Sequence, residues 1–598
     1  MKPTALRTII GCLAIIPLTI GAQTPPTTSA KPPRAHGPLR VHPLNPLYFT
    51  DGTTNSDGSL KAVYLAGHQI FVDLQDNAFN KEWTKDMSRP EAPAGKTRLL
   101  DWDRYLDWVE HLNFNYLRGW IIWSTGSGTA APPHRVASSM PFPRTGPGRA
   151  NDGQLKFDLA RFDEDFFKRL RDRARALQER GVYFSVMLFE LYGFLDGEDV
   201  NGQRLWEGNV FHPANHINGL NVDRNRNRLG EEFFSLDNTD VVKLQKTYIE
   251  KMVDVLNDLD NVLWEICNEA PTAALDWQLE MLRHLKAYES RKPKQHLILL
   301  SPGGWVPGGW RWPPEEQFTQ SPADFIATAN GWINKTDPKV CRDGKPVIMD
   351  MDHVGPGDHE PSLIWKAFTR GYHFSLYETP FEQPEQESPA WQTARENLKL
   401  TRVLAQRVEN LARLNPREDL ASTGYSLADA GQTYVIYAPK QVLIEVHGLE
   451  PGRKYRGEWF NTSKAAGEAT IPIITSSNAT LRLQPPCDQA VLFLTAARGP
   501  EQKPDSERYS VRLQEYSADP QHRINEGMST IDLLVFDTTK RVAHLSRGTS
   551  YRLEWRTFTF SEQCVVIPKM PPCMSSTRRK PGSSTCPRIA SLFAVHGG

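Results

Sequence analysis

The chain has 598 residues, of which 39% are hydrophobic and 23% are charged, a composition typical of soluble globular proteins with two or three domains. Lys and Arg together number 70, as do Asp and Glu, so the formal net charge is zero. This balance gives no support for a nucleic-acid or anionic-membrane partner. We expect no nucleic-acid partner, no membrane span and a monomeric protein.

The first 22 residues predict a secretory signal peptide. Lys2 and Arg7 precede an apolar run that ends near Ile20, and cleavage is expected after Ala22. The run is too short for a convincing membrane span. We therefore expect a secreted or periplasmic protein, in which residues 23–44 form a flexible leader that is rich in Pro, Thr and Ala at its start.

Apolar runs alternate with amphipathic helical patterns through residues 45–415. The predicted strands are 62–67, 115–123, 182–189, 261–267, 296–301, 324–329, 346–351 and 372–378, and the clearest helices are 162–180, 241–259, 275–289 and 390–413. Continuous apolar strands between helices indicate a parallel sheet covered on both faces. Eight such units predict an α/β fold, the (β/α)8 TIM barrel. No GxGxxG or P-loop motif follows a strand, and no cofactor is expected.

The pattern changes after the barrel. Short strands separated by turn signals predict a small all-β sandwich over residues 416–497. Residues 498–598 are polar and predict an irregular or poorly ordered tail, in which only 530–537 has a strand pattern.

The stretch NVLWEICNEAP, residues 261–271, carries the strongest chemical signal. Its apolar strand runs out into Asn268 and Glu269 at the carboxyl edge, where barrel enzymes place their active sites. Partial desolvation there raises the pKa of a carboxyl group and suits it to general acid catalysis. The neighbouring amide can hold a substrate hydroxyl. Alternatively, Glu269 only stabilises the start of the next helix.

Several longer stretches resemble the secreted apiosidase-like proteins, which lie within the large clan of retaining glycoside hydrolases. These stretches are YLAGHQIFVDLQD (64–76), RTGPGRANDGQLKFDL (144–159), NVLWEICNEAP (261–271), DMDHVGPGD (350–358), STGYSLADAGQTYVIYAP (422–439) and GEWFN (457–461). The resemblance covers about residues 45–495. It implies a glycosidase barrel whose acid/base Glu follows Asn at the end of strand four, and a C-terminal domain of the type named for collagen binding.

The seventh strand departs from the pattern of this clan. The resemblance puts the second carboxylate, usually Glu, at Met351, but here the acids stand on either side, at Asp350 and Asp352. Alternation along a strand gives both aspartates the same face. We predict that Asp352 is the partner of Glu269, as nucleophile or, in an inverting enzyme, as general base. Asp350 is the alternative, and a structural role for both acids is a third interpretation.

Other polar side chains are expected to bind substrate around the two carboxylates. The candidates are Asn268, Asp350, His353, Arg118, His68, Trp120, Glu190 and Glu378. A buried Arg118 needs a carboxylate partner, either in the site or simply to close the barrel. His68 follows the first predicted strand and is either a hydroxyl ligand or a core histidine. Glu190 and Glu378 end strands three and eight and are rivals for the catalytic role.

Together these observations predict an exported glycoside hydrolase that cleaves O-glycosidic bonds in plant or microbial polysaccharide. Its partner would be an oligo- or polysaccharide, and no ligand spacing predicts a metal site. Loop tryptophans such as Trp305, Trp310 and Trp312 fit sugar binding, because their flat rings match the C–H faces of sugars, although each can simply pack its own loop. The alternative is a non-catalytic carbohydrate-binding or surface-adhesion barrel.

Overall fold

The computed structural model describes residues 34–70, 73–75, 84–86, 99–125, 139–197, 203–328, 332–341, 344–352, 354, 361–376, 388–497, 508–516, 534–537, 542–545, 550–552, 565–566 and 590–596. The predicted signal peptide and the first part of the leader lie outside these residues. The chain divides into two compact units, Met1–Ala496 and Ala497–Gly598, which we describe separately.

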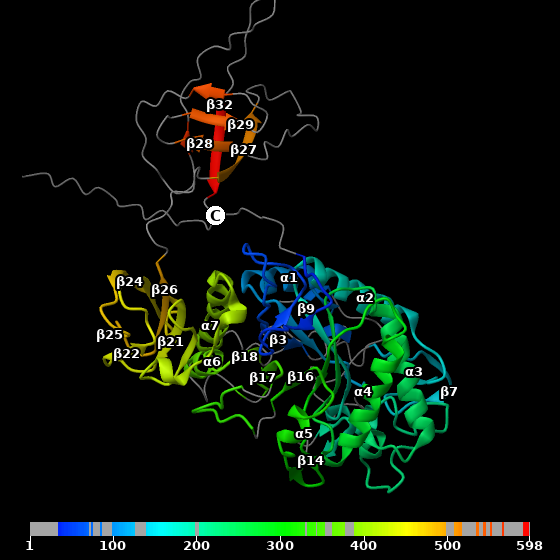
Figure 1. Ribbon diagram of the computed structural model, residues 1–598. Coiled ribbons are helices and arrows are strands. Elements are labelled where there is room, and N and C mark those ends of the chain that lie inside the picture. The colour runs from blue at the N-terminus through cyan, green and yellow to red at the C-terminus, as the bar shows by residue number, and fades with distance from the viewer. Residues whose placement is uncertain are drawn as a thin grey trace, which may run out of the picture. The chain divides into compact units, whose positions relative to one another are not determined.

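Eight parallel strands of the first unit close into a barrel (Figure 1). They are β3 (Ala66–Ile70), β6 (Tyr116–Gly119), β9 (Tyr183–Glu190), β12 (Val262–Asn268), β13 (Ile298–Leu300), β16 (Phe325–Ala327), β17 (Val347–Asp350) and β18 (Tyr372–Leu376). Each strand pairs with the next in sequence, and β18 pairs with β3. The predicted fold class is confirmed. The first strand lies further along the chain than the predicted 62–67.

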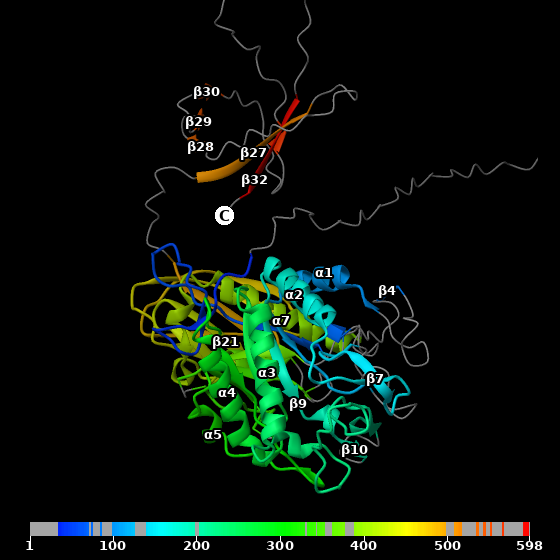
Figure 2. The ribbon, with the colours of Figure 1, turned by 90° about the vertical axis from the view of Figure 1, so that its right-hand side faces the viewer.

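Helices cover the outside of the barrel (Figures 1 and 2). They are α1 (Trp102–His111), α2 (Glu164–Glu179), α3 (Thr239–Leu256), α4 (Leu275–Glu289), α5 (Glu316–Thr319), α6 (Ser362–Phe368) and α7 (Pro389–Arg407). In α2, the Asp163 side chain accepts hydrogen bonds from the backbone N–H groups of Asp165 and Phe166, which caps the helix start. Phe166, Leu170 and Ala174 recur at helical spacing and are buried.

The barrel interior changes from apolar to polar along its axis. Its apolar part is filled by Leu65, Tyr116, Tyr183, Leu263, Leu299, Phe325, Ala327 and Ile348, together with Ala35, Leu39 and Phe49 from the N-terminal segment. Because side chains alternate, the residue two positions after an inward-facing one also faces inward. Two positions after Tyr116 comes Arg118, and two positions after Ile348 comes Asp350. The same strand faces therefore carry apolar side chains inside the barrel and polar side chains at its mouth, the end where the strands finish.

Two long connections after β6 and β9 lie together. The first contains the hairpin β7 (Arg144–Arg149) and β8 (Leu155–Phe157), and the second contains β10 (Asp196–Gly197) and β11 (Gln203–Arg204). The backbone N–H of Phe157 donates to the carbonyl of Asn215 at 2.8 Å, and that of Asn151 donates to the Asn215 side chain at 2.8 Å. These bonds fix one connection on the other.

A β-sandwich follows α7. One sheet has the order β19 (Asn415–Pro416), β20 (Ser426–Asp429), β21 (Thr433–Ala438), β26 (Ala490–Ala496), β23 (Lys454–Asn461) and β24 (Ala466–Thr475), and β22 (Ile444–His447) pairs with β25 (Thr480–Leu483). Alternate residues of the larger sheet face two different cores. Tyr434 and Ile436 face the core of the sandwich, whereas Val435 and Tyr437 join the core that lies between the barrel strands and the helices.

Asn397 of α7 links the sandwich to the barrel helices. Its Nδ2 donates to the Thr462 carbonyl at 2.7 Å, and its Oδ1 accepts from Trp365 Nε1 of α6 at 2.8 Å. All three residues are fully buried. The sandwich is therefore bonded directly to α7 and, through the same Asn397 side chain, is linked to α6.

The second unit contains a six-stranded sheet with the order β30 (Ser550–Arg552), β29 (Val542–Leu545), β28 (Leu534–Asp537), β27 (Arg508–Tyr516), β32 (Ala590–His596) and β31 (Val565–Val566). The sequence predicted an irregular tail here, with a strand pattern only at 530–537. The difference arises because four of the strands have only two to four residues, and the two longest, β27 and β32, pair across most of the tail, so the local sequence carries little of this pattern.

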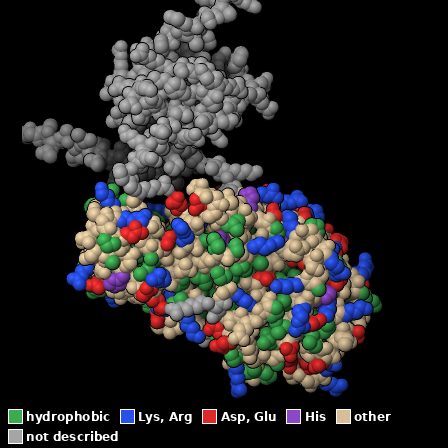
Figure 3. Space-filling model, in the orientation of Figure 1, with side chains coloured by type: hydrophobic (Ala, Val, Ile, Leu, Met, Phe, Trp, Pro, Cys, Tyr) green, Lys and Arg blue, Asp and Glu red, His purple; other side chains and the backbone are tan. Residues whose placement is uncertain are grey.

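Charged side chains of both signs are interspersed over the face of the first unit that Figure 3 shows. Within the described part of the chain, every helix is too short or too polar to cross a membrane.

Replacing Gly67 by Ala tests how closely β3 and β6 approach each other. A Cβ at Gly67 would lie 1.7 Å from the Tyr116 carbonyl oxygen, so the backbone must move. We expect Gly67→Ala to destabilise the fold by about 3 kcal/mol or more, measured by thermal and denaturant unfolding. In Gly467→Ala, the matched control, a Cβ would meet its nearest neighbour at 3.8 Å and stability should hardly change. Equal stabilities of the two variants would contradict this packing.

Candidate active site

Arg118 of β6 lies at the centre of the polar layer and is fully buried. Its Nε and Nη2 donate to the two carboxylate oxygens of Glu265, at 2.8 and 2.5 Å, and its Nη1 donates to Asp350 Oδ2 at 2.5 Å. A forked guanidinium suits this two-point contact with a carboxylate. Although burial lowers the pKa of Arg118, Asp350 and Glu265 raise it, and the net shift is upward. The side chain therefore stays charged and joins β6 to β12 and β17.

Three neutral side chains complete the shell around this guanidinium. Nη1 also donates to Gln69 Oε1 at 3.0 Å, and Nη2 donates to Asn268 Oδ1 at 2.7 Å and to Ser301 Oγ at 3.4 Å. Arg118 thus contacts residues of, or adjoining, β3, β12, β13 and β17. Sequence reasoning chose Arg118, Asn268 and Asp350 but missed Gln69 and Ser301.

The end of β12 departs from regular strand geometry. Glu265 and Asn268 both contact Arg118 although they are three residues apart, which strict alternation would place on opposite faces. The next residue, Glu269, has a φ of +52°, in the left-handed region that a residue with a side chain seldom adopts. Such strain is found mainly where a function requires it. The backbone turns here as the chain leaves the barrel strand.

The Glu269 carboxyl group lies in a negatively charged, largely dry environment. Its residue is 9% exposed, and burial raises its pKa well above the usual range, with the negative charges of Asp352 and then Asp350 adding to the rise. Arg118 opposes the shift without cancelling it. Glu269 is therefore held in the protonated form, the state that a general acid needs.

Asp350 and Asp352 have different surroundings, although both are buried. Asp350 ends β17 and is ion-paired with Arg118, and its Oδ1 accepts from the backbone N–H of Asp352 at 3.0 Å. Asp352 lies two residues beyond the end of β17 and raises the pKa of Glu269 more strongly than Asp350 does. The residue between them, Met351, is 4% exposed and donates its backbone N–H to the Ser375 carbonyl.

Glu190 binds the backbone of two loops. One oxygen accepts the backbone N–H of Trp123 at 3.2 Å and the other accepts that of Gly193 at 2.7 Å. Burial raises its pKa to about 7, and the two N–H groups partly offset this. Since both oxygens are used by the backbone, the contacts of Glu190 favour a positioning role over direct sugar binding.

His68 lies away from the mouth. It is inside β3, and its ring packs against Tyr105 and Trp108 of α1, with Nε2 at 3.1 Å from the Tyr105 hydroxyl. Burial lowers its pKa to about 4. The hydroxyl-binding role depended on a strand that ended at Gly67, but the strand continues to Ile70, so His68 faces the helix layer and Gln69 faces Arg118.

Two buried amide donors remain beside the guanidinium. Asn268 Nδ2 and Gln69 Nε2 donate no hydrogen bond to any atom of the described residues. Gln69 Oε1 also accepts from Trp120 Nε1 at 3.3 Å, which places the predicted Trp120 in the same cluster. An unsatisfied buried donor costs about 1–3 kcal/mol, so such groups are suited to receive a ligand oxygen. His353 and Glu378 lie outside the described residues.

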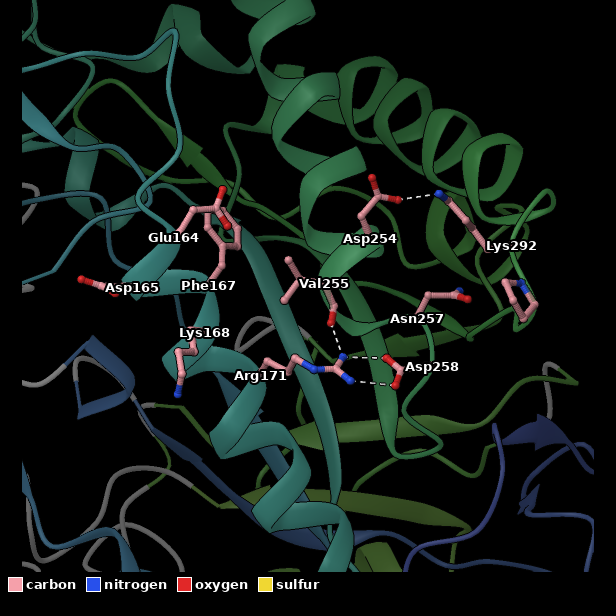
Figure 4. Close-up of a pocket in the computed structure, with 11 residues that line it drawn as sticks. Glu164, Asp165, Phe167, Lys168, Arg171, Asp254, Val255, Asn257, Asp258 and Lys292 are labelled. Carbon is pink, nitrogen blue, oxygen red and sulfur yellow. Dashed lines mark hydrogen bonds and ion pairs between the residues drawn. The ribbon is translucent and has the colours of Figure 1, made fainter.

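A separate hollow of about 710 Å³ lies on the outside of the barrel, between α2 and α3 (Figure 4). Its charged walls are already paired: Arg171 contacts Asp258 at 2.6 Å, and Lys292 contacts Asp254 at 2.5 Å. The hollow contains none of the residues that surround Arg118. The barrel mouth, with its buried acidic cluster, therefore remains the candidate site.

Residues 131–306 match a family model described as a domain of unknown function, DUF6298. No curated protein matches the chain. Similar solved structures include a candidate glycoside hydrolase of Bacteroides vulgatus (14% identity over 77% of this chain and 83% of that chain, TM-score 0.49) and a family 5 glycoside hydrolase of the same species (12%, 77% and 93%, 0.46). A maltogenic α-amylase of Thermotoga neapolitana is also similar (11%, 73% and 99%, 0.39). At these identities and TM-scores, the similarities assign no activity.

Replacing Arg118 by Met would leave Glu265 and Asp350 buried without their cation. We expect a loss of about 3–5 kcal/mol in the free energy of unfolding, measured by denaturant titration. The control Arg171→Met breaks the exposed ion pair to Asp258, which should cost about 1 kcal/mol or less. Similar losses of unfolding free energy in both variants would contradict a larger contribution of the buried cluster to stability.

Replacing Glu269 by Gln should stabilise the fold increasingly as pH rises. The unfolded chain releases the Glu269 proton near pH 4.5, whereas the folded chain keeps it to a much higher pH. Between these two pKa values the folded state binds more protons, so the wild type loses about 1.4 kcal/mol of stability per pH unit that the Gln variant does not lose. Unfolding midpoints at pH 4 and pH 8 measure this. A stability difference that is independent of pH would contradict the raised pKa.

Proposed function

We propose that the protein is a glycoside hydrolase in which Glu269 is the general acid and Asp352 is its carboxylate partner. The observation that carries this proposal is the buried acidic cluster at the mouth, in which Asp352 and Asp350 raise the pKa of Glu269. A carboxyl group that keeps its proton beside a second carboxyl group is the arrangement that glycosidic cleavage needs.

In this mechanism, protonated Glu269 donates its proton to the glycosidic oxygen as the bond to the anomeric carbon breaks. Asp352, in its ionised form, stabilises the positive charge that develops on the sugar. The resemblance to retaining enzymes supports attack by Asp352 on the anomeric carbon, followed by water that ionised Glu269 deprotonates. Asp350 does not compete for this role, because Arg118 holds one of its oxygens and the Asp352 backbone N–H holds the other.

Asn268 supports the same reaction. Its Oδ1 is fixed by Arg118, which leaves the buried Nδ2 to donate to a sugar hydroxyl. A hydrogen bond that strengthens as charge develops lowers the barrier rather than only improving binding. The positive φ of Glu269 allows consecutive residues to serve the same sugar, because it reorients the chain between them.

The resemblance to apiosidase-like proteins further supports an exported enzyme that acts on plant or microbial polysaccharide. The same resemblance suggests a C-terminal domain of the collagen-binding type, but we propose that this sandwich braces the barrel. Its sheet shares the core between the barrel strands and the helices through Val435 and Tyr437.

One observation favours a second candidate, a carbohydrate-binding barrel without turnover. Met351 is buried where the resemblance places the second carboxylate. If Asp352 does not take over that role, the mouth can still bind sugar through Asn268 and Gln69 but cannot cleave it.

Activity of variants on aryl glycosides and pectic oligosaccharides tests both candidates. We expect Glu269→Gln and Asp352→Asn each to reduce kcat by about 10³-fold or more, because each removes a group that acts on the reacting bond. Asp350→Asn should cost less, and the exposed control Glu164→Gln should cost nothing. Loss in Asp350→Asn with normal turnover in Asp352→Asn would exchange the two roles, and binding without turnover by the wild type would favour the second candidate.

A further inference from the structure

Trp310 is unusual among the surface side chains. The large hydrophobic side chains exposed in the described part of the chain are aliphatic except for this tryptophan, which is 41% exposed. It ends the hairpin of β14 (Trp305–Val306) and β15 (Gly309–Trp310), which follows β13 on the side of the barrel where the strands end. Because single exposed hydrophobic side chains are common on protein surfaces, exposure alone does not mark a site, and the way in which the Trp310 ring is held decides.

Trp310 is held in place by a layered support. Its ring stacks on that of Trp312, with centroids 5.5 Å apart and planes inclined by 19°. Trp312 lies directly over Gly304, where even a Cβ atom would come within 2.6 Å of the indole ring. The backbone N–H of Arg311, between the two tryptophans, donates to the Gly304 carbonyl at 2.5 Å. The Trp310 ring is therefore pre-positioned, and a ligand need not order it on binding.

The hairpin is also joined to the segment that follows Glu269. Pro271 and Trp305 form a parallel β-bridge, and Thr272 Oγ1 lies 3.2 Å from the Trp305 carbonyl and 3.0 Å from the Arg311 carbonyl, within hydrogen-bonding distance of both. At Gly303, a Cβ would lie 1.8 Å from the Ala270 carbonyl oxygen, so the two backbones are in close contact. The stacked pair Trp310 and Trp312 is therefore attached to the segment that follows Glu269, the proposed general acid.

We propose that Trp310 forms an outer subsite that stacks on a sugar ring of an oligosaccharide bound across the mouth, away from the bond that is cleaved. The proposal rests on the proposed function and narrows its substrate to chains of several sugars. A single flat ring fits the C–H face of a pyranose, and its apolar area is too small for a stable protein interface.

The test compares short and long substrates in Trp310→Ala, Trp310→Phe and Leu443→Ala. Leu443 is 56% exposed on the sandwich and controls for loss of exposed apolar surface. With pectic oligosaccharides of two to eight sugars, Trp310→Ala should raise KM about fivefold to tenfold for the long members only, the range expected for loss of one ring stack. Aryl glycosides should be cleaved normally, Trp310→Phe should recover most of the loss, and Leu443→Ala should match wild type.

Equal effects of Trp310→Ala on aryl glycosides and on long oligosaccharides would overturn the subsite, as would a similar loss in Leu443→Ala. Calorimetric binding of the same oligosaccharides separates this outcome from failure of the proposed function. If the wild type binds without turnover and Trp310→Ala weakens binding about fivefold, the subsite stands and the hydrolase assignment falls. Undetectable binding of every oligosaccharide by the wild type would overturn the subsite.

Discussion

The mouth of this barrel depends on one buried cation. Arg118 contacts five side chains contributed by β3, β12 and β17 and by the segment that follows β13, and two of its partners are carboxylates. Removing charges from water is costly, and only close pairing with several hydrogen bonds repays that cost. Without this guanidinium, Glu265 and Asp350 would repel each other in a dry interior. The arginine thus makes an acidic mouth compatible with a closed barrel.

Arg118 does not neutralise all the carboxyl groups at the mouth, and the remaining negative charge contributes to the raised pKa of Glu269. Two carboxylates are paired with Arg118, whereas Glu269 and Asp352 add further acidity in the same buried space. The least costly response is for one group to keep its proton, and burial together with the charges of Asp352 and Asp350 raises the pKa of Glu269. The two aspartates then divide their roles through their neighbours: Asp350 is fixed by the arginine, and Asp352 lies beyond the strand end.

The sequence predicts the barrel well because each strand is a continuous apolar run, and it predicts Asn268 and Glu269 because they follow such a run directly. Strand boundaries are harder to predict. The predicted strand 62–67 ended before His68, whereas β3 extends to Ile70, so His68 faces the helices and the prediction missed Gln69. Glu265 was missed because a single acid inside the apolar run VLWEIC gives no sign of its partner in β6. In the second unit the predicted strand pattern at 530–537 contains β28, but β27 and β32 pair from opposite ends of the unit, and the local sequence carries no sign of that pairing.

The buried contacts of Asn397 restrict how the barrel and the sandwich can be recombined in evolution. Its amide is bonded on one side to the helix after the seventh strand and on the other to the sandwich, all in a buried setting. A recombination event that exchanged the sandwich for another module would leave that amide and a strip of barrel core open to water. Barrel and sandwich should therefore be inherited as one block, with variation in substrate choice arising in the loops around the mouth.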